Sequence, residues 1–173
     1  MGFSIHHDAG YEKAIEIARK KGLKVPMLIN RGDMMKILTE YVEISTRGHA
    51  DMVDITPDVS SLIRKNDFEN GTLTVFVSGS TAGVTTIEYE PGLKKDFPEM
   101  LDKVAPAGVR YHHDDTWGDR NGHAHLRAAL IGSSLTVPFR EGKMLLGTWQ
   151  QVVVVDFDAR PRQRKIVVQI MGE

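Results

Sequence analysis

The residues best suited to chemistry in this sequence of 173 residues gather in one segment rich in histidine and aspartate. The segment runs from His112 to His125 and holds four of the seven histidines and three aspartates. Neutral imidazole binds zinc and other transition metals well, and a neighbouring carboxylate can either bind the metal or orient the imidazole ring. We therefore expect any functional site of the chain to lie here.

Two kinds of site stay open for this segment. His123 and His125 could bind one metal ion if their backbone is extended, whereas in a regular helix their side chains would point about 200° apart. The first N–H groups of a helix that opens near His123 could instead bind a phosphate. The alternative without function is a solvated polar loop whose histidines cap the helix and pair with Asp114, Asp115 and Asp119.

Composition narrows the chemistry and the partners. Cysteine is absent, so a metal would have to be held by imidazole and carboxylate. The net charge is −1, from 22 basic and 23 acidic residues, which predicts neither a nucleic-acid partner nor an acidic membrane surface. No apolar run approaches the roughly 20 residues of a membrane-spanning helix, and the first residues lack a secretory pattern, so we expect a cytoplasmic protein.

The elements that must position the segment follow from periodicity and turn residues. The length suits one main domain, predicted at 34–173, after an N-terminal extension at 1–33 with a helix at 11–21 and a strand at 25–29. Further strands are predicted at 36–44, 72–77, 84–89, 135–139, 144–146, 150–157 and 166–171, and helices at 57–65, 91–104 and 124–130.

The spacing of these strands predicts an α+β fold with antiparallel pairing and three short helices. Asn70 and Gly71 are expected to form a turn, and a polar segment from Tyr111 to Gly122 precedes the last predicted helix. A basic cluster of Arg160, Arg162, Arg164 and Lys165 is interpreted as the tip of a hairpin rather than as a nucleic-acid patch.

Weaker candidates lie outside the histidine segment. The small loop from Ser78 to Gly83 could let backbone N–H groups approach a phosphate, although it lacks the lysine and spacing of a P-loop and also suits a plain turn. Glu88 and Glu90 share one face of a predicted strand, where they could serve acid–base chemistry or face water. Trp149 suits either a core aromatic or a stacking platform.

Three C-terminal motifs resemble the YjbQ-like family, whose assigned activity is that of a secondary thiamine-phosphate synthase. They are His125–Gly132 (HLRAALIG), Ser133–Pro138 (SSLTVP) and Glu141–Gln150 (EGKMLLGTWQ). The resemblance covers about residues 36–173. It implies packed antiparallel sheets, assembly as a homotrimer, a small phosphorylated substrate and a polar site built around histidines.

The resemblance also implies roles for particular residues. The family's polar site positions fall on Glu88, His113, Asp119, Asn121 and His125, and its signature includes Trp149 and Gln150. There is one departure: many members have a histidine where this chain has Gly79. His123, where some members have a residue that is not a ligand, offers compensation.

The resulting hypothesis is a divalent metal, zinc first and magnesium as a second possibility, held by His113, His123 and His125. Glu88, Asp119 and Asn121 would be catalytic or would support the metal, and Ser80, Thr81, Trp149 and Gln150 would bind the phosphorylated substrate. The implied reaction joins hydroxymethylpyrimidine diphosphate to thiazole phosphate with release of pyrophosphate. A metal-dependent hydrolase and a non-catalytic protein that binds metal or a small anion are the alternatives.

Overall fold

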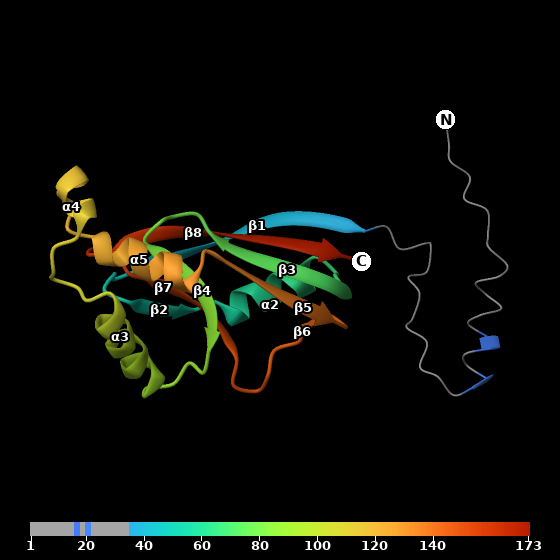
Figure 1. Cartoon of the computed structure of the whole chain (residues 1–173). Coiled ribbons are helices and arrows are strands. Elements are labelled where there is room, and N and C mark those ends of the chain that lie inside the picture. Colours follow the sequence, from blue (N-terminus) through green and yellow to red (C-terminus); the bar gives the residue numbers. More distant parts are fainter. Residues whose placement is uncertain (1–15, 18–19, 22–34) are drawn as a thin grey trace. The chain divides into compact units, whose positions relative to one another are not determined.

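The computed structural model describes residues 16–17, 20–21 and 35–173 (Figure 1). The chain divides into two units, Met1–Met34 and Met35–Glu173. In the first unit Glu16, Ile17 and Lys20 are helical, within the helix predicted at 11–21, and Lys20 pairs with Glu16 at 2.8 Å. The strand predicted at 25–29 lies outside the described residues.

The second unit contains two antiparallel sheets (Figure 1). The larger sheet has the strand order β1-β8-β3-β5-β6 and the smaller has the order β2-β7-β4. The strands are β1 (Lys36–Thr46), β2 (Asp51–Asp54), β3 (Asn70–Val77), β4 (Ala82–Ile87), β5 (Ser134–Arg140), β6 (Lys143–Met144), β7 (Gln151–Asp156) and β8 (Arg162–Gly172). Packed antiparallel sheets in an α+β fold are thereby confirmed.

The two sheets face each other across the main core. Alternate residues of β8, such as Val168 and Ile170, are buried, and they pack in one cluster with Val152 and Val154 of β7. The remaining valines of β7, including Val153, face the helices in a second cluster. A strand covered on both faces needs apolar residues at every position, which explains the continuous valine run of β7.

Four helices occur among residues 35–173, namely α2 (Thr56–Lys65), α3 (Leu93–Val104), α4 (His112–Trp117) and α5 (Gly122–Ile131). Pro57 opens α2, and Val59 and Ile63, one turn apart, bury its inner face. Helices α3 and α5 bury Leu101 and Ala128 against the side of the smaller sheet that faces away from the main core. Figure 1 shows α5 lying along β4 and β7. The sequence predicted three of these helices; α4 is an addition.

The turn predicted at Asn70 and Gly71 is wrong, because both residues belong to β3 and pair with β5. A Cβ on Gly71 would lie 2.1 Å from the carbonyl oxygen of Met171, so glycine lets β3 approach β8 closely. The chain turns earlier, where Asp67 has a positive φ of 53°.

The interpretation of the basic cluster as a hairpin tip is also wrong. Strand β7 belongs to the smaller sheet and β8 to the larger, so the connection between them crosses from one sheet to the other. Arg162 and Arg164 lie on β8 and turn inward, where they pair with the buried carboxylates of Asp158 and Asp156. Two buried carboxylates need such partners, which accounts for the position of these arginines.

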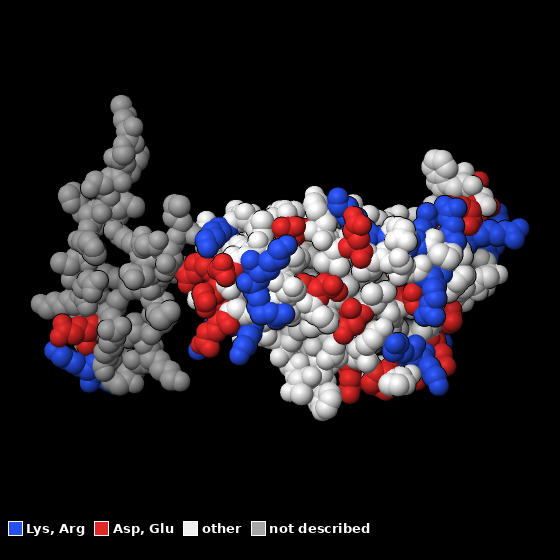
Figure 2. Space-filling model, turned by 180° about the vertical axis from the view of Figure 1, so that it is seen from behind, with Lys and Arg blue, Asp and Glu red and all other residues white. Residues whose placement is uncertain are grey.

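Charged side chains of both signs are interspersed over most of the face shown in Figure 2. None of the helices in the described residues has the length and apolar character needed to cross a membrane.

Candidate functional site

The candidate site lies where α4 and α5 meet. Glycine at the start of α5 makes this contact possible, because a Cβ on Gly122 would lie 2.5 Å from the Cβ of Tyr111. Tyr111 in turn fixes the start of α4, since its hydroxyl donates to the carbonyl oxygen of Pro106 and its N–H donates to the Asp114 carboxylate at 3.0 Å. The left-handed backbone of Gly118 ends α4 and turns the chain back toward α5.

This arrangement brings together four of the predicted site residues. The ring centroids of His113 and His125 are 4.4 Å apart, with an interplanar angle of 50°. Oδ1 of Asp119 lies 3.6 Å from Nε2 of His113. Asn121 is best oriented with its amide nitrogen toward these groups; it then donates to Oδ1 of Asp119 at 3.0 Å and to Nε2 of His113 at 3.2 Å. Asp119 and Asn121 therefore hold the His113 ring beside His125.

A cavity of about 350 Å³ adjoins this cluster through His125. Its walls come from the loop before β4, from α5 and from the start of β5, and include Gly79, Ser80, His125 and Ser133. Small residues bring these elements together: a Cβ on Gly83 of β4 would lie 2.8 Å from the carbonyl oxygen of Gly132. The site thus combines an imidazole pair with an open polar cavity.

His123 does not join this cluster. Because α5 is a regular helix, the side chains of His123 and His125 point about 200° apart. His123 is buried, and its ring centroid lies 6.5 Å from that of Tyr111. Burial lowers the pKa of His123 below its ordinary value, and the positive charge of Arg127 lowers it further. The extended backbone required for a shared ion is excluded by this helix.

The predicted pair Ser80 and Thr81 is divided between the cavity and the interior. Ser80 is exposed and lines the cavity. Thr81 is buried; its hydroxyl donates to Asp158 at 3.1 Å and accepts from Nη2 of Arg164 at 2.9 Å. Only Ser80 is therefore free to contact a ligand.

Glu88, Trp149 and Gln150 lie at the other end of β4. A strand rises about 3.3 Å per residue, so the two ends of β4 are roughly 17 Å apart. Gln150 accepts from the N–H of Gly147 at 2.7 Å and donates to Thr86 near the far end of the strand. Glu88 and Trp149 are exposed. Within one chain these three residues are separated from the histidine pair.

The predicted three-histidine metal site is not assembled by the described residues of one chain. No group of three or more histidine, aspartate or glutamate side chains among them is arranged to hold a metal ion. His113, His125 and Asp119 are the nearest approach to such a set.

The family model described as UPF0047 protein YjbQ-like matches residues 40–173. The chain belongs to this family. A UPF0047 protein of Methanothermobacter thermautotrophicus is 36% identical over 142 residues, which cover 82% of this chain and 97% of that relative. The UPF0047 protein YugU of Bacillus subtilis is 31% identical over 137 residues, which cover 78% of this chain and 100% of YugU.

Solved YjbQ-like structures share the fold. A crystal structure from Sulfolobus solfataricus, described as a YjbQ-like protein of unknown function, has a TM-score of 0.76 and 34% identity and covers 81% of this chain and 100% of its own. A hypothetical protein from Aeropyrum pernix has a TM-score of 0.73 and 32% identity, and the match covers 79% of this chain and 99% of that protein's chain. These descriptions name no activity, metal or assembly.

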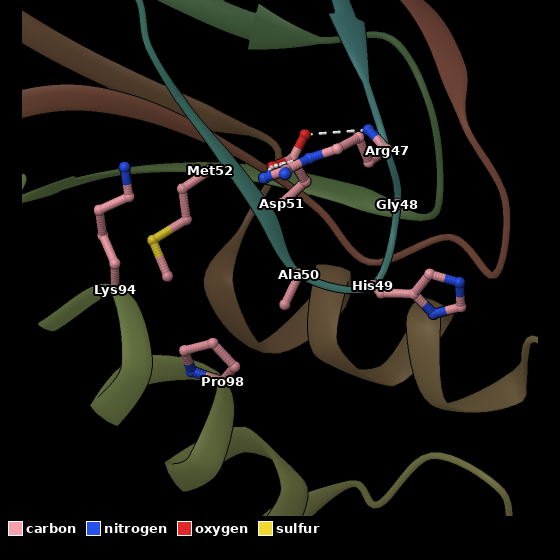
Figure 3. Close-up of a pocket in the computed structure, with 8 residues that line it drawn as sticks. All are labelled: Arg47, Gly48, His49, Ala50, Asp51, Met52, Lys94 and Pro98. Atoms are coloured by element: carbon pink, nitrogen blue, oxygen red, sulfur yellow. Dashed lines mark hydrogen bonds and ion pairs between the residues drawn. The ribbon is translucent and has the colours of Figure 1, made fainter. Parts of the chain in front are cut away.

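Sequence reasoning missed a second cavity of about 360 Å³, which this YjbQ-like chain forms between the β1–β2 turn and α3 (Figure 3). Arg47 pairs with Asp51 at 2.6 Å on its wall, and Figure 3 shows His49 pointing away from Met52 and Lys94. The carboxylate of Asp51 is partly buried, which raises its pKa, but hydrogen bonds from Arg47 outweigh burial and hold the pKa below its usual value. Six of the eight lining residues are consecutive, from Arg47 to Met52, whereas Lys94 and Pro98 come from α3, and the sequence gives no sign that these two segments meet.

Proposed function

We propose that this YjbQ-like protein is an enzyme of the thiamine-phosphate synthase type, which joins hydroxymethylpyrimidine diphosphate to thiazole phosphate and releases pyrophosphate. One observation carries the proposal: the imidazoles of His113 and His125 lie 4.4 Å apart beside an open cavity. The cavity volume of about 350 Å³ suits a small phosphorylated molecule, since small-molecule sites usually span roughly 300–1,000 Å³.

The proposed reaction breaks the bond between the methylene carbon of the pyrimidine and an oxygen of its diphosphate. The same carbon forms a new bond to the ring nitrogen of the thiazole, which becomes positively charged, while the bonding electron pair leaves with the diphosphate. Catalysis of such a step depends on donors that stabilise the negative charge of the departing oxygens. An N–H group of His125 and the hydroxyl of Ser80 would supply donors from two walls of the cavity.

His113 would act on this step through His125. Its ring is held by Asp119 and Asn121 and limits the directions in which the neighbouring His125 ring can turn. A side chain that is already oriented loses less entropy when the transition state forms. Asp119 and Asn121 are therefore positioning residues in this proposal.

We separately propose that the site binds a divalent metal, zinc first and magnesium second. Because the described residues of one chain do not assemble three ligands, His113 and His125 would supply two of them and the others would have to come from elsewhere. Imidazole and carboxylate are the donors that zinc accepts without thiolate. Elemental analysis of protein purified without a histidine tag should give about one metal ion per chain. A metal-free protein that takes up no zinc on dialysis would refute this part and leave the rest unaffected.

We further propose that the protein acts in the cytoplasm as a homotrimer. Support comes from the two separated groups of predicted site residues: Trp149 and Gln150 are remote from His125 within one chain, so a neighbouring copy is the available source of such groups at the cavity. Exposed fractions of 68% for Trp149 and 74% for Trp117 leave both aromatics open to a partner.

The test is formation of thiamine phosphate from the two precursors. The variants His113→Ala and His125→Ala should abolish product formation, whereas His112→Ala should retain it. His112 precedes His113 on α4 but is fully exposed, so it is a matched control. Equal activity in all three variants would refute the proposal.

The same assay separates the alternative functions. A hydrolase would turn over phosphate or ester substrates when the thiazole phosphate is left out, and loss of that turnover in His125→Ala would locate it at this site. A binding protein would show neither reaction and would still bind a phosphorylated ligand tightly.

A further inference from the structure

Gly79, in the loop between β3 and β4, lies where the cavity wall meets Arg164, a partly buried arginine of β8. Gly79 is exposed and lines the cavity together with Ser80 and His125. A Cβ built on Gly79 would lie 3.0 Å from Nη1 of Arg164 and, apart from the two neighbouring residues of the chain, would meet no other atom within 4 Å. Nη1 of Arg164 is therefore the one atom beyond the loop that a side chain at this position would press against.

The guanidinium of Arg164 is held firmly in place. Its Nε and Nη2 donate to the two carboxylate oxygens of Asp156 at 2.8 Å and 2.6 Å, and Nη2 also donates to Thr81. Asp156 is fully buried and the Arg164 side chain is only 12% exposed. A bidentate pair of this kind fixes the plane of the guanidinium and the direction of its remaining N–H groups.

The remaining terminal nitrogen is open to a ligand. Nη1 of Arg164 makes no hydrogen bond within residues 35–173. Among these residues the one buried side-chain polar atom without a partner is Oδ1 of Asp114, so Nη1 of Arg164 is in contact with solvent. Its two N–H donors require acceptors, and phosphate oxygens match the planar geometry of guanidinium.

We propose that the absence of a side chain at Gly79 opens a phosphate subsite, in which Nη1 of Arg164 donates hydrogen bonds to the diphosphate group of the substrate. The subsite extends the cavity of Ser80 and His125 and rests on the proposed function, whose departing group is a diphosphate. Asp156 and Asp158 balance the charges of Arg162 and Arg164, so the subsite recognises its ligand through directed N–H donors rather than through excess positive charge.

The test is calorimetric titration of the full chain with inorganic pyrophosphate. In Gly79→Ala the new methyl group would lie against Nη1, and Arg164 cannot move away because Asp156 holds it. The affinity for pyrophosphate should fall by about tenfold or more, as expected for loss of a charged hydrogen bond. Ser78→Ala, an exposed change in the same loop, should bind as the parent does.

A second variant removes the donor itself. Arg164→Lys keeps the positive charge but has no Nη1, and it should weaken pyrophosphate binding to a similar degree. If Arg164→Lys fails to fold, Gly79→Ala decides alone, because its change lies on an exposed loop.

The outcomes separate this inference from the proposed function. Unchanged affinity in Gly79→Ala, or no binding of pyrophosphate by the parent at millimolar concentration, overturns the subsite. Weaker binding of pyrophosphate by Gly79→Ala supports the subsite. If the parent chain binds pyrophosphate in this way but forms no thiamine phosphate, only the proposed function is refuted. If the parent chain forms thiamine phosphate and Gly79→Ala forms it equally well, the proposed function stands and the subsite is rejected.

Discussion

Arg164 of β8 forms a bidentate ion pair with Asp156 of β7 and so connects the two sheets. The distances are 2.8 Å from Nε and 2.6 Å from Nη2, and the carboxylate is fully buried. Thr46 of β1 donates a further hydrogen bond to the same carboxylate. The Asp156 carboxylate thus accepts hydrogen bonds from two strands of the larger sheet, close to where the chain passes from the smaller sheet to the larger.

Replacement of this carboxylate should be strongly destabilising. In Asp156→Asn the partly buried guanidinium of Arg164 would lose its hydrogen-bonded counter-charge and keep only Asp158 at 3.9 Å. Loss of one partner from a buried pair typically costs about 3–5 kcal/mol. Urea unfolding should show a correspondingly lower free energy of unfolding. Glu141→Gln serves as the control, because Glu141 pairs with Arg140 on the surface at 71% exposure. If the two variants unfold at the same urea concentration, Asp156 has no such role.

Much of the fold could be predicted from local patterns. The alternation that begins at Lys36 matches β1, and the continuous apolar run near Val152 matches a strand covered on both faces. The pairing of strands could not be predicted in the same way. Hairpin-like spacing suggested that β7 and β8 pair, but the connection crosses between the sheets. At this crossing Asp156 and Asp158 form ion pairs with Arg164 and Arg162 of β8, which hairpin spacing does not reveal.

The location of the candidate site could be predicted from the sequence, but the set of residues that form it could not. The density of histidine identified the segment that contains His113 and His125. Which imidazoles share a face depends on where α5 begins, and the sequence left that start uncertain by a residue or two. The helix directs His123 into the interior. The spacing of His123 and His125 predicted their separation only if the segment is helical.

Acid should destabilise the protein through His123. Burial lowers the pKa of this imidazole below its ordinary value of about 6.5, so the unfolded chain binds the proton more readily than the folded chain does. Stability should therefore fall as the pH drops from about 6.5 toward the lower folded pKa. Urea unfolding at pH 7 and pH 5 measures the effect.

The variant His123→Gln isolates this contribution, because glutamine does not titrate. Its loss of stability between pH 7 and pH 5 should be smaller than that of the parent. His112→Gln removes an exposed imidazole and should leave the pH dependence unchanged. A parent and His123→Gln with identical pH dependence would contradict the assignment.

A methyl group at Gly122 should separate the two histidines of the candidate site. A Cβ there would lie 2.5 Å from the Cβ of Tyr111, so α4 must shift and carry His113 away from His125. Misplacement of a positioning group by about 1 Å can reduce a rate roughly a hundredfold. Gly122→Ala should therefore lower the proposed formation of thiamine phosphate by that order. Leu126→Ala changes an exposed residue of α5 and should have little effect. Full activity in Gly122→Ala would show that the contact between the two rings is dispensable.

An apolar row on the outer face of the larger sheet should lie at the interface of the proposed homotrimer. Tyr41 of β1 and Phe76 of β3 flank Val167 of β8 and are 50% and 42% exposed. Adjoining exposed apolar side chains of this kind often mark contacts between proteins. Sedimentation should give three times the 19.3 kDa of one chain, and Phe76→Lys should shift the mass toward that of a single chain. Val104→Lys alters an exposed residue of α3, outside this row and outside the walls of the His125 cavity, and should leave the trimer intact; dissociation of that variant alone would place the interface on α3 instead.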